Sequence, residues 1–187
     1  MTATGAQRVF RHQLVWQLTD DVFQHAARLL VREAQHRHGP LSAVVGIAHG
    51  GLPLADLAAD IIGVPHHAVA ARHNPTDHAY EQATGHVHVD TSALAAALDG
   101  ARLPGPVLLV DDICGSAATL DTVIPALQPF LEPHAQVITA VLCRNIGAAR
   151  NPHLWVWDVS DWVIFPWETP PTTPASALPA PARIRTA

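Results

Sequence analysis

Short apolar runs alternate with amphipathic stretches along most of the chain. Four apolar runs have the length and composition of strands whose two faces are both buried. They comprise residues 42–48, 66–71, 105–112 and 135–144. The apolar segment 154–168 predicts one or two further strands, whereas the polar residues 72–89 have no clear period and predict a long loop or a weak hairpin.

Helical spacing fills the intervals between these runs. A helix is predicted after Thr19, whose side chain can cap the free backbone N–H groups, and it ends at Gly39. Further helices are predicted over the residues 52–63, 92–98 and 116–131. Gly63, with a proline two residues later, is typical of a helix end.

The alternation of strand and helix predicts an α/β fold, with a mostly parallel twisted sheet and helices on both faces. Such sheets bind ligands at the carboxyl ends of their strands. We expect residues 1–168 to form a single domain. The segment 169–187 is rich in proline and alanine, and we expect it to be a disordered tail.

Composition narrows the classes of function. Hydrophobic residues make up 49% of the 187 residues and charged residues 14%, which is typical of a compact globular protein. The formal net charge of −5 argues against nucleic acid or an anionic membrane as a partner. No apolar segment reaches the roughly 18 residues that span a bilayer, and two cysteines make no disulfide framework. We therefore expect a cytoplasmic protein.

Two adjacent acids, Asp111 and Asp112, stand where the apolar strand 105–112 is predicted to end. Adjacent carboxylates repel each other and lose hydration at such a position. Local N–H partners could explain them structurally. Functionally, they could accept hydrogen bonds from a vicinal diol or hold Mg²⁺ near a polyphosphate.

A small-residue loop follows the acids before the next helix begins. Its residues are Cys114, Gly115, Ser116, Ala117, Ala118 and Thr119. Small residues allow backbone amides to converge on an anion at a helix start, and the two hydroxyls can add donors. The loop is either a phosphate site or an ordinary turn between strand and helix.

The sequence VLLVDDICGSAATL, residues 107–120, resembles the phosphoribosyl-pyrophosphate (PRPP) motif of the type I phosphoribosyltransferases. The resemblance implies that Asp111 and Asp112 address the ribose hydroxyls and Mg²⁺, and that residues 114–119 cradle the 5-phosphate. The Gly-Gly turn after residues 44–47 is similar to the pyrophosphate loop of the family. That loop would consist of Ala48, His49, Gly50 and Gly51.

The sequence DWVIFPWE, residues 161–168, resembles the base-binding segment of the xanthine-guanine and hypoxanthine branch. By this resemblance Trp162 stacks on a purine, Val163 contacts its edge through the backbone, and Glu168 supplies an acid. Arg144 stands where the family usually has a lysine that touches the base. The resemblance also implies a small C-terminal base-binding hood and a homodimer or higher homo-oligomer.

Gly115 marks the main departure from the family pattern, because the family usually carries an acid there for proton transfer at the purine nitrogen. His49 also replaces a typical arginine. A general acid or base commonly contributes on the order of 10² to 10⁴ in rate. The catalytic residue is therefore unknown. Substitutes could come from the segment where the family has a flexible flap, namely His73, His78, Tyr80 or Glu81.

These features predict a Mg²⁺-dependent transferase that moves the 5-phosphoribosyl group from PRPP to a ring nitrogen of a purine or purine-like base, releasing pyrophosphate. The alternative is a PRPP- or nucleotide-binding regulatory protein with little or no catalysis. A zinc site among the histidines, such as His86 and His88, is a weaker hypothesis. A dinucleotide-binding oxidoreductase is disfavoured because no GxGxxG follows the first strand.

Overall fold

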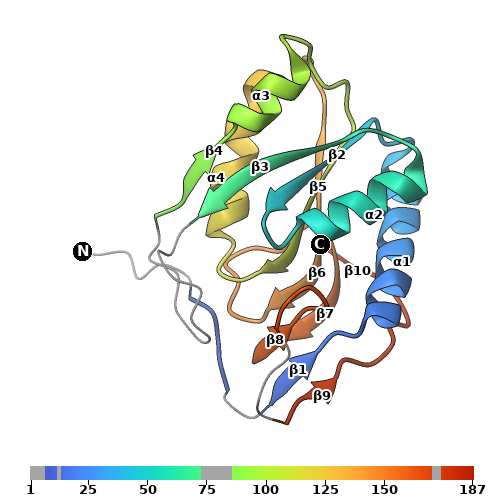
Figure 1. The fold of residues 1–187 in the computed structure, drawn as a ribbon, viewed down its shortest axis with the longest axis vertical. Coiled ribbons are helices and arrows are strands. Elements are labelled where there is room, and N and C mark those ends of the chain that lie inside the picture. Colours follow the sequence, from blue (N-terminus) through green and yellow to red (C-terminus); the bar gives the residue numbers. More distant parts are fainter. Residues whose placement is uncertain (1–6, 12–13, 73–85, 170–173) are drawn as a thin grey trace.

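The main sheet carries most of the predicted strands. The computed structural model describes residues 7–11, 14–72, 86–169 and 174–187. The strands of this sheet are β2 (Ala43–Ala48), β3 (His66–Arg72), β4 (His88–Asp90), β5 (Val107–Cys114), β6 (Val137–Asn145), β7 (Leu154–Val159) and β10 (Arg185–Thr186). Their order is β10-β7-β6-β5-β2-β3-β4 (Figure 1). The inner pairs are parallel, and β4 and β10 are antiparallel edge strands. The predicted mostly parallel sheet is confirmed.

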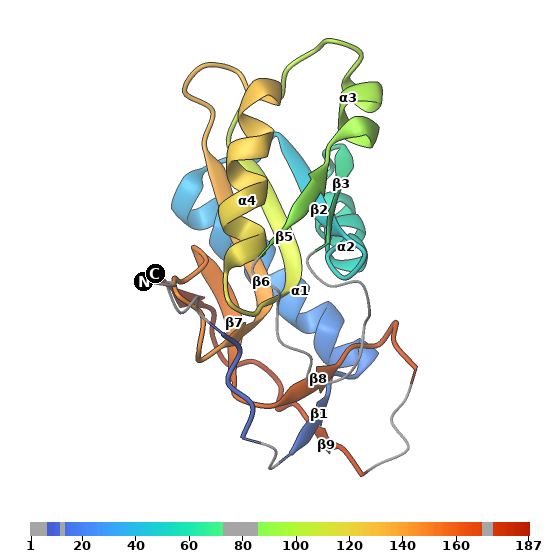
Figure 2. The ribbon, with the colours of Figure 1, turned by 90° about the vertical axis from the view of Figure 1, so that its left-hand side faces the viewer.

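Helices cover both faces of this sheet (Figures 1 and 2). They are α1 (Asp20–His38), α2 (Leu52–Ile62), α3 (Ser92–Leu98) and α4 (Ala118–Leu127), which continues into a 3₁₀ turn at Gln128–Phe130. Successive strand residues point to opposite faces. Val44 and Leu108 accordingly pack with α1 and α2, whereas Val45 and Leu109 pack with α3 and α4. Within the described part of the chain, no helix is both long and apolar enough to cross a bilayer.

Strand β5 differs from the predicted strand 105–112, because it begins at Val107 and continues beyond the two acids to Cys114. Its pairing with β2 stops at Val110, while its pairing with β6 continues to Cys114. Beyond Val110, the Gly-Gly turn that follows β2 lies beside the edge of β5 that faces β2. Asp111 and Asp112 stand at this point, on the floor of the site described below.

A second, three-stranded sheet forms the hood at the bottom of Figure 2. Its strands are β8 (Trp162–Ile164), β1 (Val15–Gln17) and β9 (Ser176–Ala177), in the order β8-β1-β9 and all parallel. A C-terminal hood was expected, but the central strand comes from the N-terminal end of the chain. Three residues are too few to show a strand period in the sequence, so β1 was not predicted.

The C-terminal tail also differs from the expectation of disorder. Beyond residue 173 it contributes β9 and β10, and Leu178 is only 5% exposed in the core shared with α1 and α2. The indole Nε1 of Trp157 donates a hydrogen bond to the carbonyl of Pro179. Scattered apolar anchors and short edge pairings hold this segment, although its proline-rich composition resembles that of a disordered chain.

Candidate active site

A cleft of about 420 Å³ lies at the carboxyl ends of β2, β3 and β5, facing the hood. Most of the residues singled out from the sequence line it. They are Ala48, His49, Gly50, Asp111, Asp112, Cys114, Gly115, Ser116, Ala117, Thr119, Trp162, Val163 and Glu168. Gly51, Ala118 and Arg144 are not among the lining residues. Its volume suits a small-molecule ligand.

The acid pair stands on the floor of the cleft. The backbone N–H of Asp112 donates to the Asp111 carboxylate at 3.0 Å. Burial, with Asp112 alongside, raises the pKa of Asp111 well above its usual range. Burial and the nearby Glu168 raise the pKa of Asp112 to about 6. Two carboxylates held in this way gain from a cationic ligand that relieves their repulsion.

The Gly-Gly turn after β2 packs directly against the acid pair. A Cβ on Gly50 would lie 2.0 Å from Oδ2 of Asp112, so only glycine leaves room for that carboxylate. A Cβ on Gly51 would lie 2.5 Å from the carbonyl oxygen of Val110, so this glycine permits close approach of the β5 backbone. The turn and the acids, far apart in the sequence, therefore form one surface.

The small-residue loop runs from the end of β5 into α4. Ala117 has φ of 81°, a left-handed conformation that is uncommon for a residue with a side chain. The Ser116 hydroxyl accepts a hydrogen bond from the N–H of Ala118 at 3.3 Å. The start of α4, with its positive dipole end, thus adjoins the cleft.

Aromatic side chains form the hood side of the cleft. Trp162 is half-buried at the start of β8, and Phe165 stacks on Trp167 with ring centres 5.2 Å apart. The backbone N–H of Phe165 donates to the Glu168 carboxylate at 2.8 Å, which orients this acid within the turn after β8. These side chains give the cleft an aromatic side, which the hood supplies.

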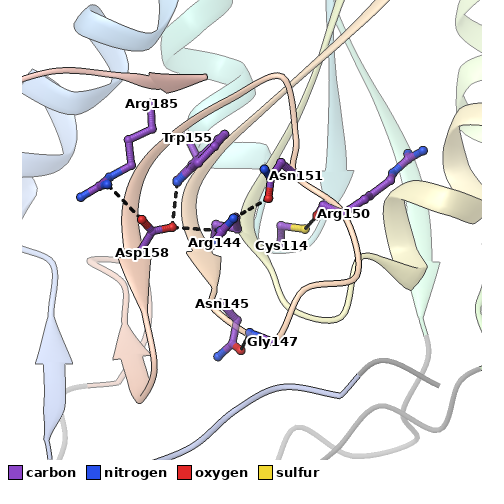
Figure 3. Close-up of polar contacts among 9 residues, drawn as sticks. All are labelled: Cys114, Arg144, Asn145, Gly147, Arg150, Asn151, Trp155, Asp158 and Arg185. Atoms are coloured by element: carbon purple, nitrogen blue, oxygen red, sulfur yellow. Dashed lines mark hydrogen bonds and ion pairs between the residues drawn. The ribbon is translucent and has the colours of Figure 1, made fainter. Parts of the chain in front are cut away.

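Arg144 lies outside the cleft, contrary to its expected role as a base contact. Its Nε is 2.9 Å from the Asp158 carboxylate, and its guanidinium lies over the ring of Trp155, 5.1 Å from the ring centre (Figure 3). Arg144 and Asp158 are paired residues of β6 and β7, so their side chains share a face of the sheet. Arg185 of β10 is ion-paired with the same carboxylate at 3.0 Å.

Arg8 and Phe10, from the segment 7–11, are among the lining residues that the sequence did not point to. The Arg8 guanidinium lies 5.9 Å from the ring centres of both Phe10 and Trp162. Burial lowers the pKa of Arg8, and the charges of Asp112 and Asp111 oppose that shift. A Cβ on Gly115 would be 2.7 Å from Nε of Arg8. The arginine thus packs against the position where the family acid was expected.

The fully buried Asn145, at the end of β6, holds the segment 7–11 in place. Its side-chain oxygen accepts from the N–H of Val9 at 2.8 Å, and its amide donates to the Val9 carbonyl at 2.9 Å. A Cβ on Gly147 would lie 2.3 Å from the carbonyl of Gln7, so glycine permits the segment to approach. No sequence pattern indicates this attachment, because Val9 and Asn145 are 136 residues apart in the chain.

The substitutes named for the missing acid fall outside the described residues. They are His73, His78, Tyr80 and Glu81. Among the residues that the structure does describe, no three histidine, cysteine, aspartate or glutamate side chains gather as a metal site, so nothing there supports zinc at His86 and His88.

Comparisons with known proteins agree with this architecture. The family model for the phosphoribosyl transferase domain matches residues 16–173. The xanthine-guanine phosphoribosyltransferase of Gluconobacter oxydans is 29% identical over 173 residues, covering 91% of this chain and 93% of that protein. Two solved structures share the fold. A purine phosphoribosyltransferase from Pyrococcus horikoshii has a TM-score of 0.68 at 20% identity, over 86% of this chain and 98% of that one. The xanthine-guanine-hypoxanthine phosphoribosyltransferase of Helicobacter pylori has 0.64 at 18%, over 82% and 91%.

The matched region runs from β1 almost to the end of the described hood and includes the acid pair, both loops and the aromatic side of the cleft. The chain therefore belongs to the type I phosphoribosyltransferase family.

Proposed function

We propose that the protein transfers the 5-phosphoribosyl group from PRPP to a ring nitrogen of a purine or purine-like base and releases pyrophosphate. One observation carries the proposal: the acid pair, the Gly-Gly turn, the small-residue loop and Trp162 line a single cleft. The likeness to xanthine-guanine phosphoribosyltransferase supports a purine-like acceptor.

Asp111 and Asp112 suit Mg²⁺, because this ion prefers carboxylate oxygens and completes its shell with water and substrate phosphates. Burial raises the pKa of both carboxyl groups, and a bound cation would offset the cost of burying their negative charge. When bound, the ion would neutralise charge on the polyphosphate. The same carboxylates would hold the ribose hydroxyls and would stabilise the positive charge that develops on the sugar ring.

The two loops divide the phosphates between them in this proposal. Residues 115–119 adjoin the start of α4, where backbone amides and the helix dipole favour an anion, and would hold the 5-phosphate. Ala48, His49 and Gly50 would hold pyrophosphate. Arg72, at the end of β3, also lines the cleft and brings a positive charge to that side.

The acceptor base would lie against the aromatic side of the cleft. Trp162 offers a ring for stacking, Val163 offers backbone groups, and Glu168 is oriented by its bond to the Phe165 N–H. Arg144 has no part in this proposal, because Asp158 and Trp155 hold it outside the cleft.

A regulatory protein that binds PRPP or a nucleotide without turnover is the second candidate. The observation that favours it is Gly115, where Arg8 packs in place of an acid. Both candidates bind PRPP at the same acids, so only product formation separates them.

Mass spectrometry of one reaction tests the proposal: purified protein, PRPP, Mg²⁺ and a pool of purine and purine-like bases. A new nucleoside monophosphate, absent with Asp112→Asn and present with Asp60→Asn on the exposed side of α2, supports the transferase. Calorimetry with PRPP and Mg²⁺ covers the other candidate. Binding without any product would favour the regulatory protein, and no binding would exclude both.

A dimer and a cytoplasmic location complete the proposal. Light scattering of the purified full-length chain tests the first, because a monomeric mass at micromolar concentration would contradict it. Fractionation of the source cells tests the second, and recovery with the membrane fraction would contradict it.

A further inference from the structure

Arg8 lies in the cleft because hydrogen bonds to Asn145 and Ser160 hold the segment 7–11 in place. Val9 is bonded through both backbone groups to the buried Asn145, and the N–H of Arg11 donates to the carbonyl of Ser160 at 2.8 Å. Alternate residues of an extended segment point to opposite sides. The backbone of Val9 is bonded to Asn145, and its two neighbours, Arg8 and Phe10, both line the cleft.

The guanidinium of Arg8 stands between the two functional sides of the cleft. On one side lie the rings of Phe10 and Trp162, each centre 5.9 Å away. On the other lies Gly115, at the start of the small-residue loop. Flat aromatic rings suit a planar heterocycle better than a phosphate, so in the proposed function the acceptor base would meet Arg8 on this side.

We propose that Arg8 is a specificity-determining residue that selects acceptor bases which enter the cleft as anions, deprotonated at a ring nitrogen. The inference deepens the proposed function and rests on it. An arginine cannot accept a proton near neutral pH, but its charge stabilises a nearby anion. A base whose ring N–H ionises readily therefore matches this cleft, and a base that must lose its proton inside the cleft does not.

The chemical step balances without an acid at residue 115. The ring N–H proton passes to water before the base binds. The nitrogen electron pair then forms the bond to the sugar carbon C1, the bond between C1 and oxygen breaks, and its electron pair leaves with pyrophosphate. Arg8 contributes by holding the negative charge of the acceptor until that bond forms.

Other charged or titratable groups bear on Arg8. Asp112 and Asp111 of β5 face it, as do the thiols of Cys143 on β6 and Cys114 on β5. Burial raises the pKa of Cys114 to about 12 and that of Cys143 well above its usual range, so both thiols are neutral near pH 8. The negative charges of the carboxylates attract the guanidinium of Arg8.

The test compares two acceptors that differ in the acidity of one ring N–H: hypoxanthine and its more acidic 8-aza analogue. Calorimetry at pH 8 gives the dissociation constant of each base for the wild type, Arg8→Gln, Arg8→Lys and the control Arg11→Gln. Arg11 belongs to the same segment but is exposed, and it does not line the cleft.

We expect Arg8→Gln to weaken binding of the aza analogue about 10- to 100-fold, the range of a lost charge-assisted hydrogen bond, and binding of hypoxanthine less than about threefold. Arg8→Lys should keep most of the preference, and Arg11→Gln should match the wild type. PRPP affinity should change less than the affinity for the aza analogue in every variant.

Three outcomes would overturn the proposal: equal losses for both bases, no change with Arg8→Gln, or a wild type that does not prefer the aza analogue. Weakened PRPP binding in Arg8→Gln, with base affinities unchanged, would assign Arg8 to phosphate instead. If the transferase proposal fails but the role of Arg8 holds, PRPP will stay unconsumed while the preference for the more acidic base still depends on Arg8.

Asn145 should act on the same preference as a positioning residue. Asn145→Ala removes the clamp on Val9 and leaves Arg8 in the chain, so the preference for the aza analogue should fall, by less than in Arg8→Gln. An Asn145→Ala protein that remains folded and keeps the full preference would contradict this role of Asn145.

Discussion

Nε of Arg8 lies where a side chain at residue 115 would begin, 2.7 Å from the Cβ that an alanine would carry there. The two positions therefore share one space, although residue 8 precedes the region that matches the family model and residue 115 lies within it. A chain with an acid at residue 115 would have to move Arg8, so the glycine and the arginine depend on each other.

Gly115→Ala should lower the free energy of unfolding by about 1 to 2 kcal/mol, because an added methyl group overpacks the space that Arg8 fills. Urea denaturation measures the loss. In an Arg8→Ala background most of the loss should vanish, whereas in an Arg11→Ala background it should remain. Equal losses in all three backgrounds would mean that the two residues do not share space.

Asp112 predicts a dependence of stability on pH in the absence of ligand. Burial raises the pKa of Asp112 from its usual 3.8 to about 6 in the folded protein. The folded state therefore binds this proton more tightly than the unfolded chain, and the resulting stabilisation is fully present when the pH is below 3.8. This contribution is lost as the pH rises through about 6. Asp112→Asn should therefore melt a few degrees higher than the wild type at pH 8 and nearly equally at pH 4.

Thermal unfolding followed by circular dichroism measures this difference, with Asp60→Asn as the control for an exposed carboxylate. The same Asp112→Asn protein should lose PRPP binding. A variant that melts below the wild type at pH 8 would show that the charged carboxylate is stabilised in the free protein, against the direction given by its burial.

Leu178 predicts that the tail contributes to stability. Its side chain is 5% exposed and packs in the core with α1 and α2, so Leu178→Ala should cost about 2 to 4 kcal/mol. Arg183→Ala, an exposed neighbour, should cost little. Urea midpoints compare the two, and an unchanged midpoint for Leu178→Ala would mean that the tail is dispensable.

Arg144 gives a prediction that separates a structural from a binding role. Because its guanidinium is ion-paired with Asp158 and lies over Trp155, Arg144→Gln should lower stability and leave base affinity within about threefold of the wild type. Thermal unfolding and calorimetry with the acceptor measure both quantities. A large loss of base affinity with unchanged stability would mean that Arg144 contacts the base.

The sequence predicted the main sheet because apolar runs and helix signals are local features. Val44 and Leu108 belong to such runs, and the structure has both in the core. The acid pair could also be recognised as a candidate site, because two adjacent carboxylates after an apolar run repel each other and lose hydration. The strand continues through them, however, since pairing with β6 outlasts pairing with β2.

The missed features depend on contacts between distant parts of the chain. The bonds of Asn145 to Val9 and the approach of Arg8 to Gly115 leave no local pattern. The strand β1 is too short for its period to be recognised. The position of Arg144 followed the family pattern in the sequence, but Asp158 on the neighbouring strand determined where its side chain lies.

The central strand of the hood has a consequence for synthesis of the protein. Val15 pairs with Trp162, and Trp16 pairs with Ser176, so β1 is made before the inner strands of the main sheet but pairs with strands that are made after them. The helices and inner strands of the main sheet can pack while translation continues, because most of their neighbours are already present. The aromatic side of the cleft is completed only after β8 and β9 are made, and a nascent chain can therefore hold the acid pair before it can enclose a base.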